Sequence, residues 1–161
     1  MPNLLTLLVF APCEKVIVGE DDHLTSMIAL MERVNIQVSG QLPADAIFPL
    51  KWSVCALWHR AMEVDPPRMF EQKFQILRPD GEEAAHALSV FAVTNDHQNF
   101  RNVLHLNAFP IGLPGAYRLR LALREKDDPT EWQYAAEYPL EVFHEITAEP
   151  SKKESSNEVS T

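Results

Sequence analysis

The sequence predicts an all-β protein folded as an antiparallel two-layer β-sandwich of roughly seven to nine strands. Two segments late in the chain alternate strictly between apolar and polar residues, and shorter segments of similar character precede them at regular intervals. No stretch keeps the helical period for long. A single domain is expected, because 161 residues lie close to the usual size of one domain.

The clearest strand lies in the segment PGAYRLRLALRE, residues 114–125. Its apolar side chains fall at every second position, and its arginines share the opposite parity: Tyr117, Leu119, Leu121 and Leu123 against Arg118, Arg120 and Arg124. This alternation predicts a half-buried strand, since a helix would spread the same leucines around its axis. The arginines are therefore expected on a solvated face, with a groove for phosphate or an acidic peptide as the alternative.

The following segment, EWQYAAEYPLEV at residues 131–142, repeats the pattern. One parity carries Trp132, Tyr134, Ala136, Tyr138, Leu140 and Val142, and the other carries Glu131, Gln133, Glu137 and Glu141. The intervening EKDDPT supplies turn residues, so the pair predicts a hairpin whose outer face sets arginines opposite glutamates. Pro139 predicts an edge or a bulge within the second strand.

Earlier segments complete the set of strands. Residues 50–60 and 70–77 alternate, and residues 87–94 and 100–109 are rich in Val, Leu and Phe. Residues 23–38 fit a helix or a strand, and their strand-rich context favours strand. The sandwich is predicted to span residues 1–144, followed by a disordered polar tail at 145–161, where the apolar periodicity ends.

Charge and cysteine content limit the possible partners and the location. The net charge of −9 argues against a nucleic-acid binder and against an anionic membrane surface. The apolar run from Leu4 to Phe10 is too short for a membrane span and lacks a basic region before it, so a cytoplasmic protein is expected. Cys13 and Cys55 show no metal or redox spacing and are predicted to be reduced and packed.

The ends of the predicted sandwich resemble those of a family of uncharacterised small bacterial proteins. The resemblance rests on FAPCEKVIVGEDDHLTSMIAL near the N-terminus and on LPGAYRLRLAL followed by YPLEV. It implies an immunoglobulin-like β-sandwich. The family has no established activity or site that the resemblance would carry over.

Catalytic motifs are not visible in the sequence. The serines lack a G-x-S-x-G elbow, the six histidines form no H-x-H or H-E-x-x-H spacing, and five scattered glycines form no phosphate-binding loop. We therefore expect a protein that is not an enzyme and has no cofactor.

Acidic loops provide one candidate site. If successive connections alternate between the two ends of the sandwich, the loops at 19–23, 63–68, 94–99 and 125–130 share one end. Their aspartates could then bind a hard cation such as Ca²⁺: Asp21, Asp22, Asp65, Asp96, Asp127 and Asp128. Turns favour Asp in any case, so a purely structural origin stays open.

Apolar, proline-flanked loops at the opposite end provide the other candidate site. They carry five apolar residues, which are Leu42, Ile47, Phe48, Ile111 and Leu113. Stiff apolar loops suit a protein-binding surface, because little entropy is lost when they bind. The same side chains could instead cap the core. The main hypothesis is a protein-binding or accessory module whose partner is another protein or a second copy; the alternative is a calcium or small-ligand protein.

Overall fold

The computed structural model describes residues 4–20, 24–128 and 131–147, and it contains nine strands and no helix in these ranges. The strands are β1 (Leu5–Val18), β2 (Thr25–Leu30), β3 (Arg33–Val38), β4 (Ile47–Arg60), β5 (Arg68–Leu77), β6 (Glu83–Val93), β7 (Asn99–Pro110), β8 (Gly115–Glu125) and β9 (Gln133–Ile146). No helix of these described ranges is therefore long and apolar enough to cross a membrane. β9 runs two residues past the domain boundary expected at 144, and residues 148–161 lie outside the description.

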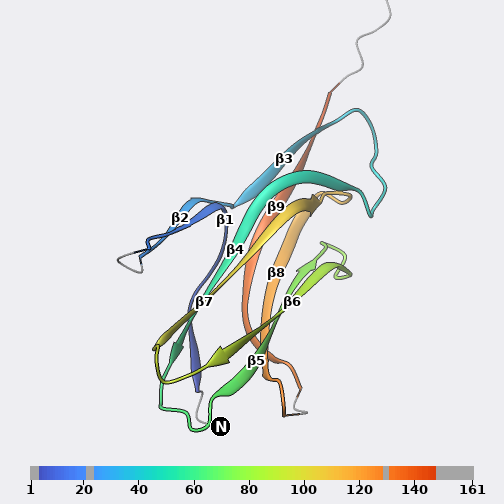
Figure 1. The fold of residues 1–161 in the computed structure, drawn as a ribbon. Helices are drawn as coiled ribbons and strands as arrows, with labels where there is room; N and C mark the ends of the chain where they lie inside the picture. Colours follow the sequence, from blue (N-terminus) through green and yellow to red (C-terminus); the bar gives the residue numbers. More distant parts are fainter. Residues whose placement is uncertain (1–3, 21–23, 129–130, 148–161) are drawn as a thin grey trace, which may run out of the picture.

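The strands form two sheets that pack as layers (Figure 1). The first has the order β2-β1-β4-β7 and the second the order β3-β9-β8-β5-β6. The predicted sandwich and strand number are thus confirmed. One pairing departs from the antiparallel prediction, because β3 runs parallel to β9, with Val34 opposite Val142. The parallel pairing arises because the chain crosses from one sheet to the other between β2 and β3.

The core lies between the sheets and consists of the apolar parity of each central strand. Trp52 of β4 packs against Phe74 of β5 and Phe109 of β7, with ring centroids 6.2 and 5.3 Å apart. Leu119 and Leu121 of β8 are fully buried, as the alternation predicted. Each such large apolar side chain contributes about 1.5–3 kcal/mol by leaving water.

The side chains of β9 do not keep the alternation that the sequence predicted, as the outer face of the second sheet shows. The register shifts between Leu121 and Ala122, so that Leu121 faces Ala136 but Ala122 faces Tyr134. This irregularity turns Tyr134 outward, where 60% of it is exposed. Tyr134 and Trp132 instead lie against the guanidinium groups of Arg120 and Arg124, at 5.5 and 4.4 Å from the ring centres.

The arginines of β8 pair with acids as predicted, although only partly within the hairpin. Arg120 lies 3.2 Å from a carboxylate oxygen of Glu137 on β9. Arg124 pairs instead with Glu71 on the other neighbouring strand, β5, at 2.6 Å. The solvated-face interpretation therefore accounts for both side chains.

Pro139 sits in a strand that has neighbours on both sides, yet the proline is tolerated. It pairs with Arg118 of β8. On its other side β3 pairs with β9 only from Glu141 onward. At position 139 the strand is therefore locally an edge, where the missing N–H of proline costs no ladder hydrogen bond.

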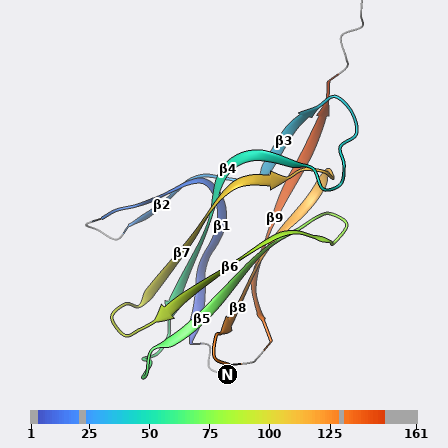
Figure 2. The ribbon, with the colours of Figure 1, turned by 45° about the vertical axis from the view of Figure 1, so that its right-hand side comes forward.

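The described part of the ambiguous segment 23–38 forms two strands, β2 and β3, so strand rather than helix is confirmed, but it is two strands and not one. β2 pairs with the second half of β1, and the chain then crosses to the other sheet before β3. β1 pairs with β4 from Leu5 to Cys13 and with β2 from Cys13 to Val18. The β1–β2 ribbon therefore projects from the side of the sandwich (Figures 1 and 2).

Candidate protein-binding groove

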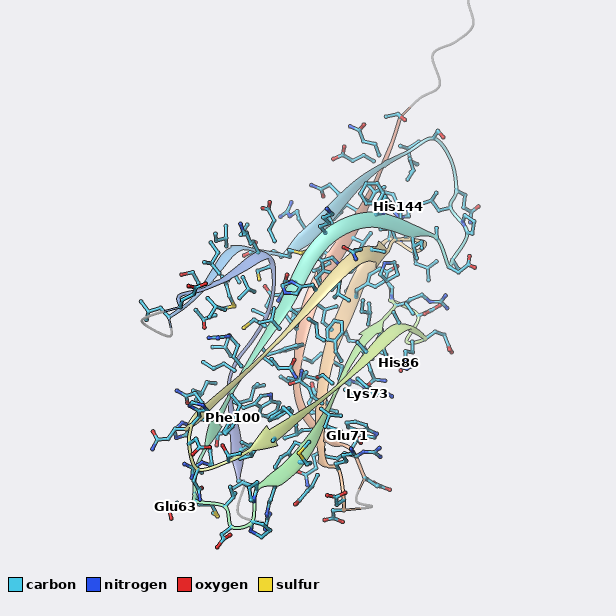
Figure 3. All side chains as sticks on the ribbon, viewed as in Figure 1. Glu63, Glu71, Lys73, His86, Phe100 and His144 are labelled. Atoms are coloured by element: carbon cyan, nitrogen blue, oxygen red, sulfur yellow. The ribbon has the colours of Figure 1, made fainter. Side chains whose placement is uncertain are left out.

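The acidic loops do not all share one end, because the extra crossing before β3 changes the alternation. The connections β4–β5, β6–β7 and β8–β9 lie together at the lower end, where Figure 3 labels Glu63, while the β1–β2 ribbon points sideways. Asp65, Asp96, Asp127 and Asp128 belong to these lower loops. Asp21 and Asp22 lie outside the described residues.

Local hydrogen bonds hold two of the lower loops together. Asn95 accepts from the Val64 N–H at 2.9 Å and donates to its carbonyl at 2.8 Å. The largely buried Arg60 donates to the Met62 carbonyl at 2.7 Å. Within residues 4–20, 24–128 and 131–147, no three His, Cys, Asp or Glu side chains gather closely enough to hold a metal ion.

The five apolar residues expected to bind a partner are divided by the structure into three environments. Ile111 is only 4% exposed and belongs to the core, as the capping interpretation predicted. Its carbonyl accepts a hydrogen bond from His144 at 2.6 Å, and its N–H donates to Ala46 at 2.8 Å. Ile111 therefore cannot contact a partner without opening the fold.

Leu42 and Leu113 are half-buried at the same end of the sandwich. Both line a mainly apolar hollow of about 470 Å³ between the β3–β4 and β7–β8 connections and the end of β9. Figure 3 labels His144, which also lines this hollow. The sequence correctly placed these two loops at one end of the sandwich, although it could not show that the β7–β8 connection contributes Ile111 to the core.

Ile47 and Phe48 are the exposed members of the set, and they begin β4 rather than lie on a loop. Their exposed fractions are 70% and 39%. Both pair with the end of β7, opposite Pro110 and Phe109. β1 joins β4 only from Ser53 onward, so the first residues of β4 have a neighbour on one side only.

β3 faces this unpaired part of β4 with a free backbone edge of its own. The Glu141 N–H donates to the Glu32 carbonyl at 3.1 Å, and the Thr147 N–H donates to the Val38 carbonyl at 3.0 Å. Even-numbered residues of β3 thus direct their backbone groups to β9. Because backbone groups alternate along a strand, the N–H and C=O groups of Arg33, Asn35 and Gln37 point away from the sheet.

The β3–β4 groove lies between these two edges and measures about 530 Å³. Residues 29–36 form one wall, and Phe48, Leu50 and Lys51 form the other, with Glu14 at the rim. Met31 and Leu50 are half-buried at its base and contact the core, while Leu30 is 54% exposed. The groove therefore combines unpaired backbone groups with an apolar floor.

Phe48, one of the residues that the sequence singled out, lines this groove, whereas the residues of the opposite wall were not predicted. Placing β3 beside the start of β4 depends on the crossing between sheets and on the departure of β1 at Cys13. Neither event has a local signature in the residues, except that β3 alternates cleanly between exposed Arg33, Asn35 and Gln37 and buried Val34, Ile36 and Val38.

Outside the groove, one serine–histidine pair and two cysteines are side chains with catalytic potential. Ser53 Oγ lies 3.0 Å from His105 Nδ1, but no carboxylate in the described part of the chain hydrogen-bonds this histidine. Cys13 and Cys55 are both free and buried, and burial raises the pKa of each thiol. A serine nucleophile needs an oriented base, and a reactive cysteine needs a lowered pKa.

Comparisons with known proteins find similar structures at low similarity. No protein-family model matches the chain. No curated protein sequence matches it either. An immunoglobulin-like protein, PA1606 from Pseudomonas aeruginosa, covers 86% of this chain and 95% of its own, with 11% identity and a TM-score of 0.36. The N-terminal domain of PorA covers 84% and 97%, with 8% identity and a TM-score of 0.27. These values carry no argument about function, and membership of the bacterial family stays a prediction.

Proposed function

We propose that the protein is a non-enzymatic binding module that holds an extended segment of a partner protein in the β3–β4 groove. The segment adds a strand to the free edge of β3, as in other cases of β-strand addition. Backbone hydrogen bonds to Arg33, Asn35 and Gln37 supply affinity without regard to sequence. Side chains of the bound segment supply the selectivity.

The observation that carries this proposal is the coincidence of a free strand edge with an apolar floor. An exposed edge alone is a hazard that most sheets cover or blunt. Here the edge borders Met31, Leu50 and Phe48, which leave apolar surface at the side of the core. A bound strand would direct every second side chain onto this surface, so a segment with alternating apolar residues fits best.

Charges at the rim favour a segment of mixed charge rather than a strongly basic or acidic one. Glu14 and Glu32 lie at the groove together with Arg33 and Lys51. All four are exposed. Their interactions with a ligand are expected to affect the rate and register of binding more than its strength.

A displayed library of random peptides, selected on the immobilised protein, tests the proposal. Enriched peptides should contain alternating apolar residues, and the variant Phe48→Ser should lose them. The matched control is Tyr134→Ser, which removes an exposed aromatic side chain from the outer face of the other sheet. Melting curves of both variants establish that they remain folded.

Two results would contradict the proposal. The first is the absence of any enriched peptide on the wild-type protein. The second is a set of peptides that binds wild type and Phe48→Ser equally well, because it would place the site away from the groove.

A further inference from the structure

β6 forms the other free edge of the five-stranded sheet, at the opposite end of the strand order from β3. Residues 84–95 contain no Asp, Glu, Lys or Arg. Leu88 and Val90 point outward and are 59% and 48% exposed. Figure 3 labels His86 on β6 and Lys73 on β5, on the outer face where Lys73 is the cross-strand partner of Leu88.

The two free edges of the four-stranded sheet, β2 and β7, carry features that discourage pairing. β2 has only six residues and contains Ala29 with a φ of 54°. β7 carries Arg101 and ends at Pro110. Charges, prolines and short irregular strands are the usual protection of sheet edges. Between Ala85 and Val93, where β6 pairs regularly with β5, the strand has none of them.

β7 does not cover the outward row of β6. The two strands leave their shared loop and diverge in both views (Figures 1 and 2). Near the loop, Asn102 donates to Ser89 at 2.7 Å, and the rings of Phe91 and Phe100 lie 6.3 Å apart. These contacts involve the inward parity of β6, so Leu88 and Val90 stay exposed.

We propose that β6 pairs with β6 of a second copy, antiparallel about a two-fold axis near Leu88. Copies with a net charge of −9 repel one another, so contact is favoured where carboxylates are absent. Antiparallel pairing about Leu88 sets Glu83 of one copy near Val93 of the other. Parallel pairing would set the two Glu83 carboxylates side by side, which is unfavourable.

This inference does not depend on the proposed function. β3 and β6 lie at opposite edges of the sheet, so the dimer leaves both β3–β4 grooves open. A dimer would then present two grooves and could bind a partner with two matching segments more tightly than one copy could.

Sedimentation across a concentration series tests the dimer. The wild-type protein should form a dimer that dissociates on dilution. Leu88→Lys should weaken the dimer at least about tenfold, because it sets two like charges across the axis. Its melting temperature, measured at a concentration where the wild type is monomeric, should fall only slightly, because the new charge lies opposite Lys73 of β5 at a mainly exposed position. The matched control, Ile47→Lys, alters a more exposed apolar residue at the groove side and should leave the dimer intact.

A wild-type protein that stays monomeric at every concentration would overturn the inference, as would a dimer that resists Leu88→Lys but is lost in Ile47→Lys. If Leu88→Lys fails to fold, amide exchange of wild-type β6, measured at several protein concentrations, tests the pairing instead. Protection of β6 that rises with protein concentration is expected, and protection independent of concentration excludes the pairing.

Discussion

Trp58 Nε1 donates a hydrogen bond to Gln72 Oε1 at 2.7 Å, and both side chains are buried between the sheets. The bond joins β4 to β5 and is the means by which a polar side chain that is 2% exposed is accommodated in the core. A buried polar group without a partner costs free energy, so the pair should behave as one unit.

Replacing Gln72 by Leu should lower the free energy of unfolding by about 1–3 kcal/mol, because the Trp58 N–H is left unpaired. The double variant Trp58→Phe, Gln72→Leu should lose less than the sum of the two single variants. Urea unfolding of the four proteins measures the coupling. Strict additivity would show that the bond does not contribute to stability.

The strand parity of β8 is tested by two neighbouring substitutions. Leu121→Asp should unfold the domain, because it puts an unpaired charge at a fully buried position. Arg120→Asp should cost about 1 kcal/mol or less, since it removes only a partly exposed ion pair with Glu137. Equal urea midpoints for the two variants would rule out the strand assignment.

The sequence predicted the layers and the core well because alternation reports directly on burial. Every apolar position expected from Leu119 to Leu123 is buried. Where a register shift occurs, as at Ala122, the alternation no longer reports the face, and the expected burial of Tyr134 was wrong. The remaining errors concern which strands and loops lie side by side, which depends on contacts between residues far apart in the chain.

The candidate sites were predicted less well than the core. Loop ends were assigned by counting strands, so one additional crossing before β3 moved the β1–β2 ribbon away from the other acidic loops. Phe48 was singled out as an apolar residue in a proline-flanked segment, while its neighbours across the groove come from β2 and β3. Such a site depends on which strands fail to pair, and no local pattern records that.

Acid should remove a contribution that Glu83 makes to stability. Partial burial acts to raise its pKa, but hydrogen bonds with Gln75 and His86 and the charge of Lys73 outweigh it and lower the pKa below the ordinary 4.5. A carboxyl group whose pKa is lower in the folded than in the unfolded protein stabilises the fold at pH values above the unfolded pKa. This contribution is lost as the pH falls through the folded pKa. Wild type should therefore exceed Glu83→Gln in stability at neutral pH.

The difference between these two proteins should vanish as the pH drops below 4.5, the ordinary value for a glutamate carboxyl. Urea midpoints across this pH range provide the measurement, at protein concentrations low enough to keep the chain monomeric. A difference that persists unchanged in acid would show that the carboxylate charge is not responsible.

The two thiols should react slowly in the folded protein. Burial raises the pKa of Cys13, and burial together with the neighbouring Cys13 raises that of Cys55. A chromogenic disulfide reagent at mildly alkaline pH should therefore label both only after denaturant is added. Prompt labelling of either thiol without denaturant would contradict the buried placement.

Calcium should leave the melting temperature unchanged, because the described carboxylates do not gather into a site. A specific ion present at a hundredfold excess over its Kd would instead add about 2.7 kcal/mol of stability. Titration with Ca²⁺, with Mg²⁺ as the control, distinguishes the cases. A saturable rise with Ca²⁺ alone would contradict this expectation and support the metal hypothesis.

Backbone amide exchange along β3 tests the proposed groove most directly. In the free protein, the amides of Asn35 and Gln37 should exchange fast, while those of Ile36 and Val38, which point to β9, should exchange slowly. A peptide selected on the groove should slow Asn35 and Gln37 and leave Ile36 and Val38 unchanged. Protection of Asn35 and Gln37 before any peptide is added, or no change after it binds, would contradict strand addition at this edge.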